Sequence, residues 1–381
     1  MAKANKPIIL AAGGTGGHIF PAEALARELL KRGHTVTLVT DKRGHAFGDS
    51  LPEVPVHRIR AGSPSGGLLG KLKGGVQLLL GVFDARALLK RLDPVAVVGF
   101  GGYPSVPTIY AAGRAGVPVL LHEQNAVLGR ANRLLFASAR RVAVAYPQVS
   151  GVADPTKLVQ TGNPVRPAVA AKRHALYDVP SADGPVRILV MGGSQGARVF
   201  SEVIPAALAL LPADLRGRIH LSQQCRPEDL EGARAALTPL ALGSVELESF
   251  FRDVPERLAS AHLAITRAGA STVAELTCVG RPAVLVPYPF ATDDHQTANA
   301  QAVAHAGAAW HVPQPQFTAE TLAQRLTALL SNPAELARAA QASAAWGTDA
   351  AASTLADAVL ALAGRGAGTN GNHPHATEAA E

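Results

Sequence analysis

The chain is poor in cysteine and aromatic residues, and it has no long apolar run. Two cysteines in 381 residues cannot form a disulfide framework, which favours a reducing compartment such as the cytosol. Aromatic residues make up 4%, too few for the stacking platforms that bind single-stranded nucleic acid. The apolar run 8–12 is too short for a signal peptide, and no stretch reaches the roughly 20 apolar residues that span a membrane. We therefore expect a soluble protein.

What is present describes a well-buried, basic protein. Hydrophobic residues make up 48% and charged residues 17% of the chain, a composition typical of globular proteins. The length suits two domains of roughly 150 residues each. A formal net charge of +7 attracts the phosphates of nucleotides, nucleic acids or anionic lipids, and does not choose among them.

Short apolar runs alternate with longer helical patterns, which predicts a parallel α/β architecture. The expected buried strands are 8–11, 36–40, 95–99, 117–121 and 142–145 in the first half, and 188–191, 219–222, 263–266 and 284–286 in the second. The run 162–167, Gly-Asn-Pro-Val-Arg-Pro, is rich in turn formers and indicates the domain junction. Residues 364–381 have no apolar face and are expected to be a disordered tail.

Both halves open with a strand, a glycine loop and a helix. The loops are 13–18, Gly-Gly-Thr-Gly-Gly-His, and 192–196, Gly-Gly-Ser-Gln-Gly. Such a loop lets backbone N–H groups approach a phosphate at the positive end of the helix dipole. Neither loop has the Lys-Ser/Thr of a P-loop NTPase. We predict two nucleotide-binding-type domains that face each other across a cleft; tight strand–helix packing is the alternative for either loop alone.

His18 follows the first loop. An imidazole with an ordinary pKa near ~6.5 suits a general base. The alternative is a histidine that only donates a structural hydrogen bond.

The segment 267–275, Arg-Ala-Gly-Ala-Ser-Thr-Val-Ala-Glu, follows a predicted strand and starts a helix. Its first-turn N–H groups are free to hold a diphosphate, and Glu275 lies about one turn in, where a carboxylate can accept hydrogen bonds from a ribose diol. Alternatively, Ser271 or Thr272 caps the helix and Glu275 complements its dipole. That alternative leaves Arg267 without a role.

Two further segments follow predicted strands, where α/β sites are built. They are 122–125, His-Glu-Gln-Asn, and 293–296, Asp-Asp-His-Gln. His122 and Glu123 are possible metal ligands, but the chain lacks a matching His-Glu-x-x-His spacing, so no metal site is expected. Asp293 and Asp294 are expected to be a solvated helix start.

These motifs, together with 101–103 (Gly-Gly-Tyr) and 162–166, occur in the order of the MurG family of glycosyltransferases, which the chain resembles from about residue 8 to residue 345. The family has the GT-B fold, in which two Rossmann-like domains face across a cleft. Its members transfer GlcNAc from UDP-GlcNAc to lipid I, an undecaprenyl-linked acceptor, to form lipid II in peptidoglycan synthesis. They work at the cytoplasmic face of the membrane, without a cofactor or metal ion and without nucleic acid.

The resemblance implies an acceptor- and membrane-facing domain over 1–165, a donor-binding domain over 166–347 and a helix over 348–363 that packs back on the first domain. It also implies the inverting mechanism, with His18 as the base. The implied contacts are Ser194, Ala270, Ser271 and Thr272 with the diphosphate, Arg166 as added charge, the Phe251 backbone with uracil, Glu275 with the ribose and Gln296 with GlcNAc. Thr15, Gly16, Gly17 and Asn125 complete the cleft, and Tyr103, His122 and Glu123 lie on the acceptor side.

The acceptor would require contact with an anionic membrane surface. The segment 68–76, Leu-Leu-Gly-Lys-Leu-Lys-Gly-Gly-Val, mixes leucines with lysines and suits a headgroup interface. The alternative is an amphipathic helix packed on the sheet, particularly over 76–89.

Three other functions compete. Another GT-B enzyme could transfer a UDP-sugar to a glycolipid or small-molecule acceptor. A UDP-GlcNAc 2-epimerase would need carboxylates placed for proton transfer, which the motifs do not supply. A basic protein could use both domains only to bind nucleotide or nucleic acid, with a steep salt dependence.

Overall fold

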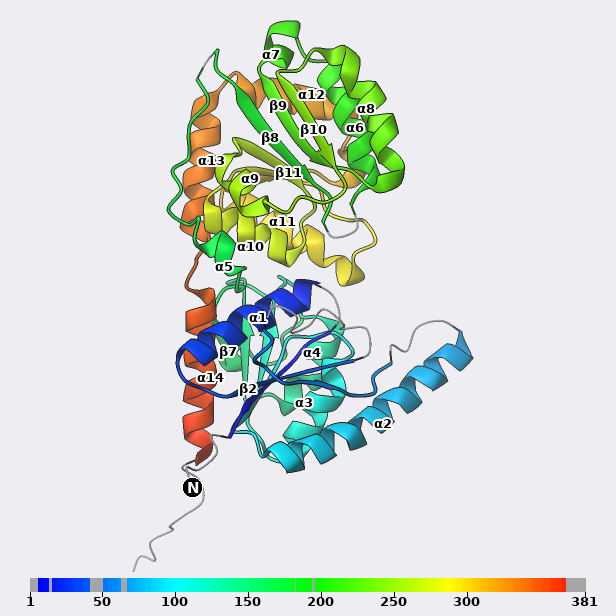
Figure 1. The fold of residues 1–381 in the computed structure, drawn as a ribbon, viewed down its shortest axis with the longest axis vertical. Helices are drawn as coiled ribbons and strands as arrows, with labels where there is room; N and C mark the ends of the chain where they lie inside the picture. The colour runs from blue at the N-terminus through cyan, green and yellow to red at the C-terminus, as the bar shows by residue number, and fades with distance from the viewer. Residues whose placement is uncertain are drawn as a thin grey trace, which may run out of the picture.

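The computed structural model describes residues 6–13, 16–41, 51–62, 67–181, 183–193 and 196–367. The chain forms two domains, stacked end to end, each with one parallel sheet between helices (Figure 1). The two-domain α/β fold predicted from the sequence is confirmed.

The first sheet has the strand order β3-β2-β1-β4-β5-β6-β7 and is parallel throughout. Its strands are β1 Ile8–Ala11, β2 Val36–Thr40, β3 Val56–Arg58, β4 Ala96–Gly99, β5 Val119–Glu123, β6 Arg141–Val144 and β7 Leu158–Gln160. The strands predicted from apolar runs are all present. The strands β3 and β7, which were not predicted, are the two edges of this sheet.

The second sheet has the order β10-β9-β8-β11-β12-β13 and is also parallel. Its strands are β8 Val186–Met191, β9 Ile219–Gln224, β10 Ser244–Glu248, β11 Leu263–Thr266, β12 Ala283–Leu285 and β13 Ala309–His311. Again the predicted strands are present, and the unpredicted β10 and β13 are the edges.

Helices cover both faces of the sheets, which explains the continuous apolar runs of the central strands. In β1, Ile8 and Leu10 belong to one core cluster while Ile9 and Ala11 belong to another on the opposite face. The α-helices are α1 Gly16–Lys31, α2 Leu68–Leu92, α3 Ser105–Arg114, α4 Arg130–Leu135, α5 Pro167–Ala170, α6 Arg198–Ala209, α7 Ala213–Gly217, α8 Leu230–Leu237, α9 Val254–Ser260, α10 Ala270–Val279, α11 His295–His305, α12 Ala319–Leu330, α13 Pro333–Trp346 and α14 Ala351–Ala367.

The last helix, α14, returns to the first domain (Figure 1). Leu355, Ala356 and Val359 are fully buried in the same core cluster as Ile8 and Leu10. Arg32, directly after α1, fixes α14 through an ion pair with Asp357 and a hydrogen bond to the Ser353 hydroxyl. The helix continues past residue 364, where the sequence predicted the tail to begin; residues 368–381 lie outside the described residues.

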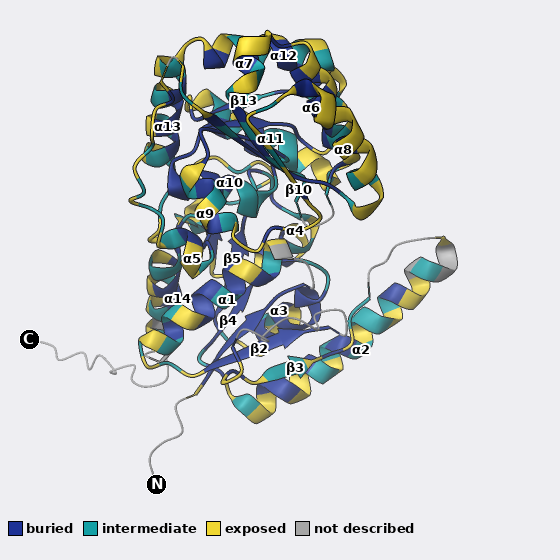
Figure 2. Ribbon diagram, turned by 45° about the horizontal axis from the view of Figure 1, so that its top comes forward, coloured by how far each residue is buried: buried dark blue, intermediate teal, exposed yellow. Residues whose placement is uncertain are grey.

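The long helix α2 projects from the first domain and alternates between buried and exposed faces (Figure 2). Among the described helices, none has the length and apolarity that a bilayer-crossing segment needs.

Candidate functional site

The start of α10 lies at the carboxyl end of β11, where a ligand meets the sheet edge. Gly269 precedes the helix in an extended conformation and provides no side-chain cap. The first helical hydrogen bond runs from the Val273 N–H to the Gly269 carbonyl, 3.0 Å. The N–H groups of Ala270, Ser271 and Thr272 therefore have no acceptor within the helix. These are the amides that the sequence predicted to be available to a diphosphate.

The alternative interpretation of this segment, a capping box, is wrong. Neither Ser271 nor Thr272 caps α10, because both lie inside the helix. The Ser271 Oγ is buried and has no hydrogen-bond partner within the described part of the chain. A buried hydroxyl without a partner is uncommon, and it lies beside the three amides.

Glu275 and Arg166, which the sequence predicted at the ribose and the diphosphate, are paired with each other. The guanidinium donates from Nε to Oε1 at 2.7 Å and from Nη2 to Oε2 at 2.8 Å. Glu275 is 8% exposed. Arg166 immediately precedes α5 and also lies over the Phe20 ring of α1, 5.6 Å from its centroid. The pair therefore connects the interdomain linker, the second domain and the first helix of the first domain.

Arg267, left without a role by the capping interpretation, holds the loop after β12. It donates to the carbonyls of Val286 and Pro287, and its guanidinium lies 5.3 Å from the Phe200 ring centroid and 5.6 Å from that of Tyr288. Burial lowers the pKa of Arg267.

Gln296 ties the same loop to the start of α10. Its Oε1 accepts from the Ala268 N–H at 3.2 Å and from the Tyr288 N–H at 2.9 Å. The side-chain carbonyl is thereby used within the second domain.

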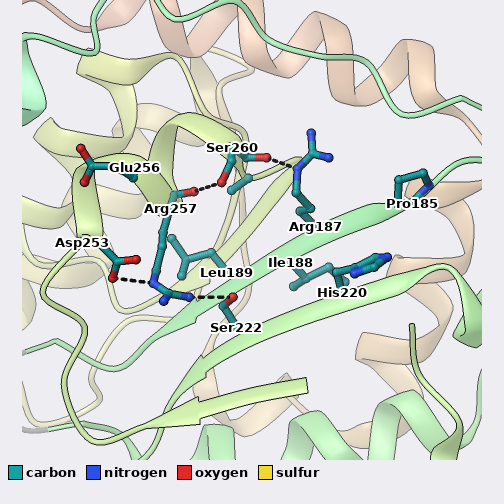
Figure 3. Close-up of a pocket in the computed structure, with 11 residues that line it drawn as sticks. Pro185, Arg187, Ile188, Leu189, His220, Ser222, Asp253, Glu256, Arg257 and Ser260 are labelled. Atoms are coloured by element: carbon teal, nitrogen blue, oxygen red, sulfur yellow. Dashed lines mark hydrogen bonds and ion pairs between the residues drawn. The ribbon is translucent and has the colours of Figure 1, made fainter. Parts of the chain in front are cut away.

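Phe251 is buried after β10, and its ring is covered by Arg257, whose Cζ lies 4.0 Å from the ring centroid. Arg257 is fixed by Glu246 and, as Figure 3 shows, by Asp253 and the Ser222 hydroxyl. Arg257, Asp253 and Ser222 line an open hollow of about 520 Å³ on the face of β8 and β9. None of the predicted donor residues lines this hollow, so it is separate from the start of α10.

His18 lies in the first turn of α1, against a glycine pair that follows β4. Gly101 and Gly102 have φ of +87° and +74°, and a β-carbon on either would approach the imidazole to 3.3 and 3.4 Å. His18 Nδ1 is buried and has no partner among the residues that the structure describes. Burial lowers the pKa of His18, against the opposing effect of the Glu123 carboxylate. The ring is therefore neutral near pH 7 and keeps a nitrogen lone pair.

His122 and Glu123, predicted on the acceptor side, are buried at the end of β5 and engaged by their own domain. His122 Nε2 is 3.1 Å from the Gly162 carbonyl and Nδ1 is 3.3 Å from the Gln124 amide nitrogen; burial lowers the pKa of His122 to about 4. Glu123 accepts from the N–H groups of Asn125 and Gly129 and from two side-chain amides. Both are buried, whereas Tyr103, which precedes α3, is partly exposed.

Asn125 joins the two domains through Asn299 of α11. Asn299 Nδ2 donates to Asn125 Oδ1 at 3.0 Å and to the Ala268 carbonyl at 3.1 Å, while its Oδ1 accepts from the Ala126 N–H at 2.8 Å. Asn299 is fully buried, and the sequence analysis missed it. The available signal was an asparagine in a helix interior, where its intrinsic propensity is low.

Asp293 and Asp294 are exposed at the start of α11, as the sequence predicted. Asp293 also pairs with Arg130 of the first domain at 2.8 Å, and both aspartates adopt a left-handed backbone with φ of 53° and 51°. The ion pair bridges the two domains beside the Asn299 contact.

Of the glycine loops, Gly16 and Gly17 begin α1, whereas Thr15 and Ser194 lie outside the described residues. Gly192 allows its loop to close tightly, because a β-carbon there would lie 2.3 Å from the Ala197 nitrogen. Within the described ranges, no three His, Cys, Asp or Glu side chains gather as a metal site would require.

Comparison with known proteins identifies the same two domains. Residues 8–144 match the glycosyltransferase family 28 N-terminal domain, and residues 187–358 match its C-terminal domain. A protein of Rhodospirillum centenum, named UDP-N-acetylglucosamine–N-acetylmuramyl-(pentapeptide) pyrophosphoryl-undecaprenol N-acetylglucosamine transferase, is 62% identical over 95% of this chain and 96% of its own length. A protein of the same name from Paramagnetospirillum magneticum is 57% identical over 94% and 97%.

Solved structures give the same result for the fold. MurG of Acinetobacter baumannii is 32% identical, with a TM-score of 0.78 over 93% of this chain and 99% of that one. UDP-GlcNAc 2-epimerase of Neisseria meningitidis shares the fold at 15% identity, with a TM-score of 0.65 over 93% and 100%. The chain is a GT-B protein of glycosyltransferase family 28 and belongs to its MurG group.

Proposed function

We propose that this chain transfers GlcNAc from UDP-GlcNAc to the 4-hydroxyl of the MurNAc of lipid I, with inversion at C1, to form lipid II. The names of relatives at 62% and 57% identity support the reaction. The observation that carries the proposal is the start of α10, where three amides without helical acceptors and a buried, unpartnered hydroxyl lie one turn before Glu275.

The donor would bind mainly to the second domain. The amides of Ala270 to Thr272 would hold the diphosphate, together with Ser194 and Arg166. Glu275 would accept from the ribose hydroxyls, and the backbone at Phe251 would contact uracil. The Nε2 amino group of Gln296 would donate to the GlcNAc. Asn125 and the loop of Thr15, Gly16 and Gly17 would close the site from the first domain.

Transfer places new negative charge on the leaving UDP. Amides at a helix start and a guanidinium meet this demand, because their dipoles and charge are aimed at the phosphate before the reaction begins. We therefore propose that the enzyme needs no divalent ion and no cofactor, and we expect activity to survive EDTA.

His18 would take the proton of the attacking hydroxyl. It is neutral at pH 7 because burial lowers its pKa, and its ring lies against Gly101 and Gly102. His122 and Glu123 would act as positioning residues for the acceptor side rather than touch the acceptor, and Tyr103 remains the candidate for direct contact.

The direct test is incubation of the protein with UDP-GlcNAc and lipid I, with UDP and the disaccharide product as readouts. We expect His18→Ala to lower kcat by about 10² to 10⁴-fold, the usual contribution of a general base, and to leave donor binding nearly unchanged. A variant with near-normal kcat would remove His18 from this role. Turnover with a glycolipid or small-molecule acceptor in place of lipid I would favour the alternative transferase, which the shared name of the relatives does not support.

The acceptor is membrane-borne, and we propose that α2 docks on an anionic bilayer at the cytoplasmic face. Leu72, Val76, Leu79 and Phe83 are exposed and recur every three or four residues, so they form one stripe along the helix. Arg86 and Lys90 continue the same face and supply charge that attracts anionic lipid. The opposite face, with Ala85 and Leu89, is buried on the domain.

The stripe extends beyond the predicted segment 68–76, and the side chains of residues 68, 69 and 71 lie outside the described residues. The proposal thus assigns the two sequence interpretations of α2 to opposite faces of one helix.

Flotation with phosphatidylglycerol vesicles tests the docking proposal. Replacing Leu79 and Phe83 by serine should abolish co-flotation, whereas Leu176→Ser, at a leucine 91% exposed in the second domain, should not. Equal flotation of all three proteins would contradict α2 as the contact.

A further inference from the structure

The Arg166–Glu275 ion pair has one fixed and one movable partner. Glu275 is held in α10, and its side chain is 10% exposed, whereas the Arg166 side chain is 34% exposed and extends from the linker. Arg166 has Glu275 on one side and the Phe20 ring on the other, and within the described part of the chain its guanidinium donates its hydrogen bonds to that carboxylate. The guanidinium can therefore leave without disrupting a helix or strand.

The donor site lies within reach of this guanidinium. Ser271 and Glu275 are four residues apart and lie on the same face of α10, about 6 Å apart along the axis at 1.5 Å per residue. Arginine has a long, flexible side chain, so a movement of one helical turn takes its guanidinium from the carboxylate to the amides at the helix start.

We propose that donor binding exchanges the partners of this ion pair: the ribose hydroxyls replace Arg166 on Glu275, and the released guanidinium moves onto the diphosphate. The exchange rests on the proposed donor site and adds a selection rule to it. A nucleotide is bound tightly only if its ribose carries the hydroxyls that Glu275 needs when Arg166 leaves.

A nucleotide that lacks the ribose diol can bind in two ways, and both are unfavourable. Arg166 can stay on Glu275, and the diphosphate then lacks its cation. Alternatively, Arg166 moves and leaves a buried carboxylate unpaired, which is costly because the charge is taken from water without compensation. We expect wild-type protein to bind 2′,3′-dideoxy-UDP at least about 30-fold more weakly than UDP, the low end of the loss when a buried charge pair loses a partner.

Isothermal titration calorimetry with the full chain separates this exchange from a purely structural ion pair. The variant Glu275→Gln keeps the shape of the side chain but releases Arg166 without leaving a buried charge. It should bind UDP about 10-fold more weakly, because a charged acceptor for the ribose is lost. It should bind dideoxy-UDP more tightly than wild-type protein does, by several-fold. This opposite response of the two nucleotides is the expected signature.

The gain for dideoxy-UDP must come from Arg166. In the double variant with Arg166→Gln it should disappear. Glu202→Gln, which removes an exposed ion pair with Arg198 on α6, should leave both affinities at wild-type values. Thermal unfolding of each variant establishes that the protein is folded.

Equal weakening of both nucleotides in Glu275→Gln, or unchanged affinity for dideoxy-UDP, would overturn the exchange while leaving UDP as the ligand. If Glu275→Gln does not fold, Glu275→Asp provides the same comparison, because the shorter carboxylate keeps the charge but loosens the ion pair with Arg166. An unchanged ratio of the affinities for UDP and dideoxy-UDP in that variant would also overturn the exchange. Wild-type protein that binds UDP no better than ADP would instead contradict the proposed donor, a separate failure.

Discussion

Glu123 of the first domain and Glu275 of the second are both buried, and the two carboxylates are held in different ways. Glu123 in the first domain is 1% exposed and accepts from four neutral N–H groups, on Asn125, Gly129 and Asn132, at 2.8 to 3.2 Å. Glu275 in the second domain accepts from a single guanidinium that arrives from the linker.

This difference separates a structural carboxylate from one that a ligand can engage. The donors to Glu123 lie in the loop and in the start of α4 that follow it, so they cannot leave without disrupting that segment. The donor to Glu275 is one side chain on another segment, and its departure costs no backbone structure. We therefore expect mutations at Glu123 to act on folding, and mutations at Glu275 to act on donor binding.

Glu123→Gln should have the largest effect. One oxygen becomes an amino group that faces N–H donors, so buried hydrogen bonds are lost and an unsatisfied donor remains. We expect the free energy of unfolding to fall by about 3 kcal/mol, measured by urea denaturation. A loss below about 1 kcal/mol would remove the distinction from Glu275.

Glu275→Gln should have the opposite effects: it should weaken donor binding and change stability little. We expect the KM for UDP-GlcNAc to rise by about 10-fold, the value of a charge-assisted hydrogen bond, with a stability change of about 1 kcal/mol or less because Arg166 remains partly solvated. Steady-state kinetics at saturating lipid I measures the first quantity and urea denaturation the second. An unchanged KM for the donor would refute the ribose assignment.

The pH dependence of kcat/KM tests a second effect of Glu123, which is its influence on the pKa of His18. The base must be neutral, so activity is lost as pH falls through its pKa. Burial lowers this pKa and Glu123 raises it. The acid limb should therefore lie below the pKa of a free imidazole, and it should move to still lower pH in a folded Glu123→Gln protein. A shift to higher pH would contradict the assignment.

Asp293→Asn should have the smallest effect. Its pair with Arg130 crosses the domains, but the arginine side chain is 62% exposed. Exposed pairs of this kind contribute about 0 to 1 kcal/mol, so we expect less than about a five-fold change in kcat/KM. The difference should shrink as salt is raised, because exposed charges are screened. A larger, salt-independent loss would show that the left-handed turn itself shapes the site.

The sequence predicted the centre of each sheet and missed its edges. Central strands such as β1 are buried on both faces and read as continuous apolar runs, whereas β3, β7 and β10 are half-exposed and have no such run. The strand β13 has only three residues. Apolar patterning identifies a strand only where both of its faces are covered.

In the candidate site, too, the sequence predicted some features and missed others. The helix start at 270 and the glycine pair beside His18 are local motifs, and the sequence identified both. The pairing of Arg166 with Glu275 joins residues 109 positions apart, and that of Arg130 with Asp293 joins residues 163 apart. No local pattern predicts such contacts, because they depend on how the domains come together.

A crystal structure of the protein with UDP tests the central claim most directly. We predict diphosphate oxygens within hydrogen-bond distance of the N–H groups of Ala270, Ser271 and Thr272, ribose hydroxyls on Glu275, and Arg166 moved onto the phosphates. A diphosphate bound elsewhere, or an Arg166–Glu275 pair that persists beside bound UDP, would contradict the account.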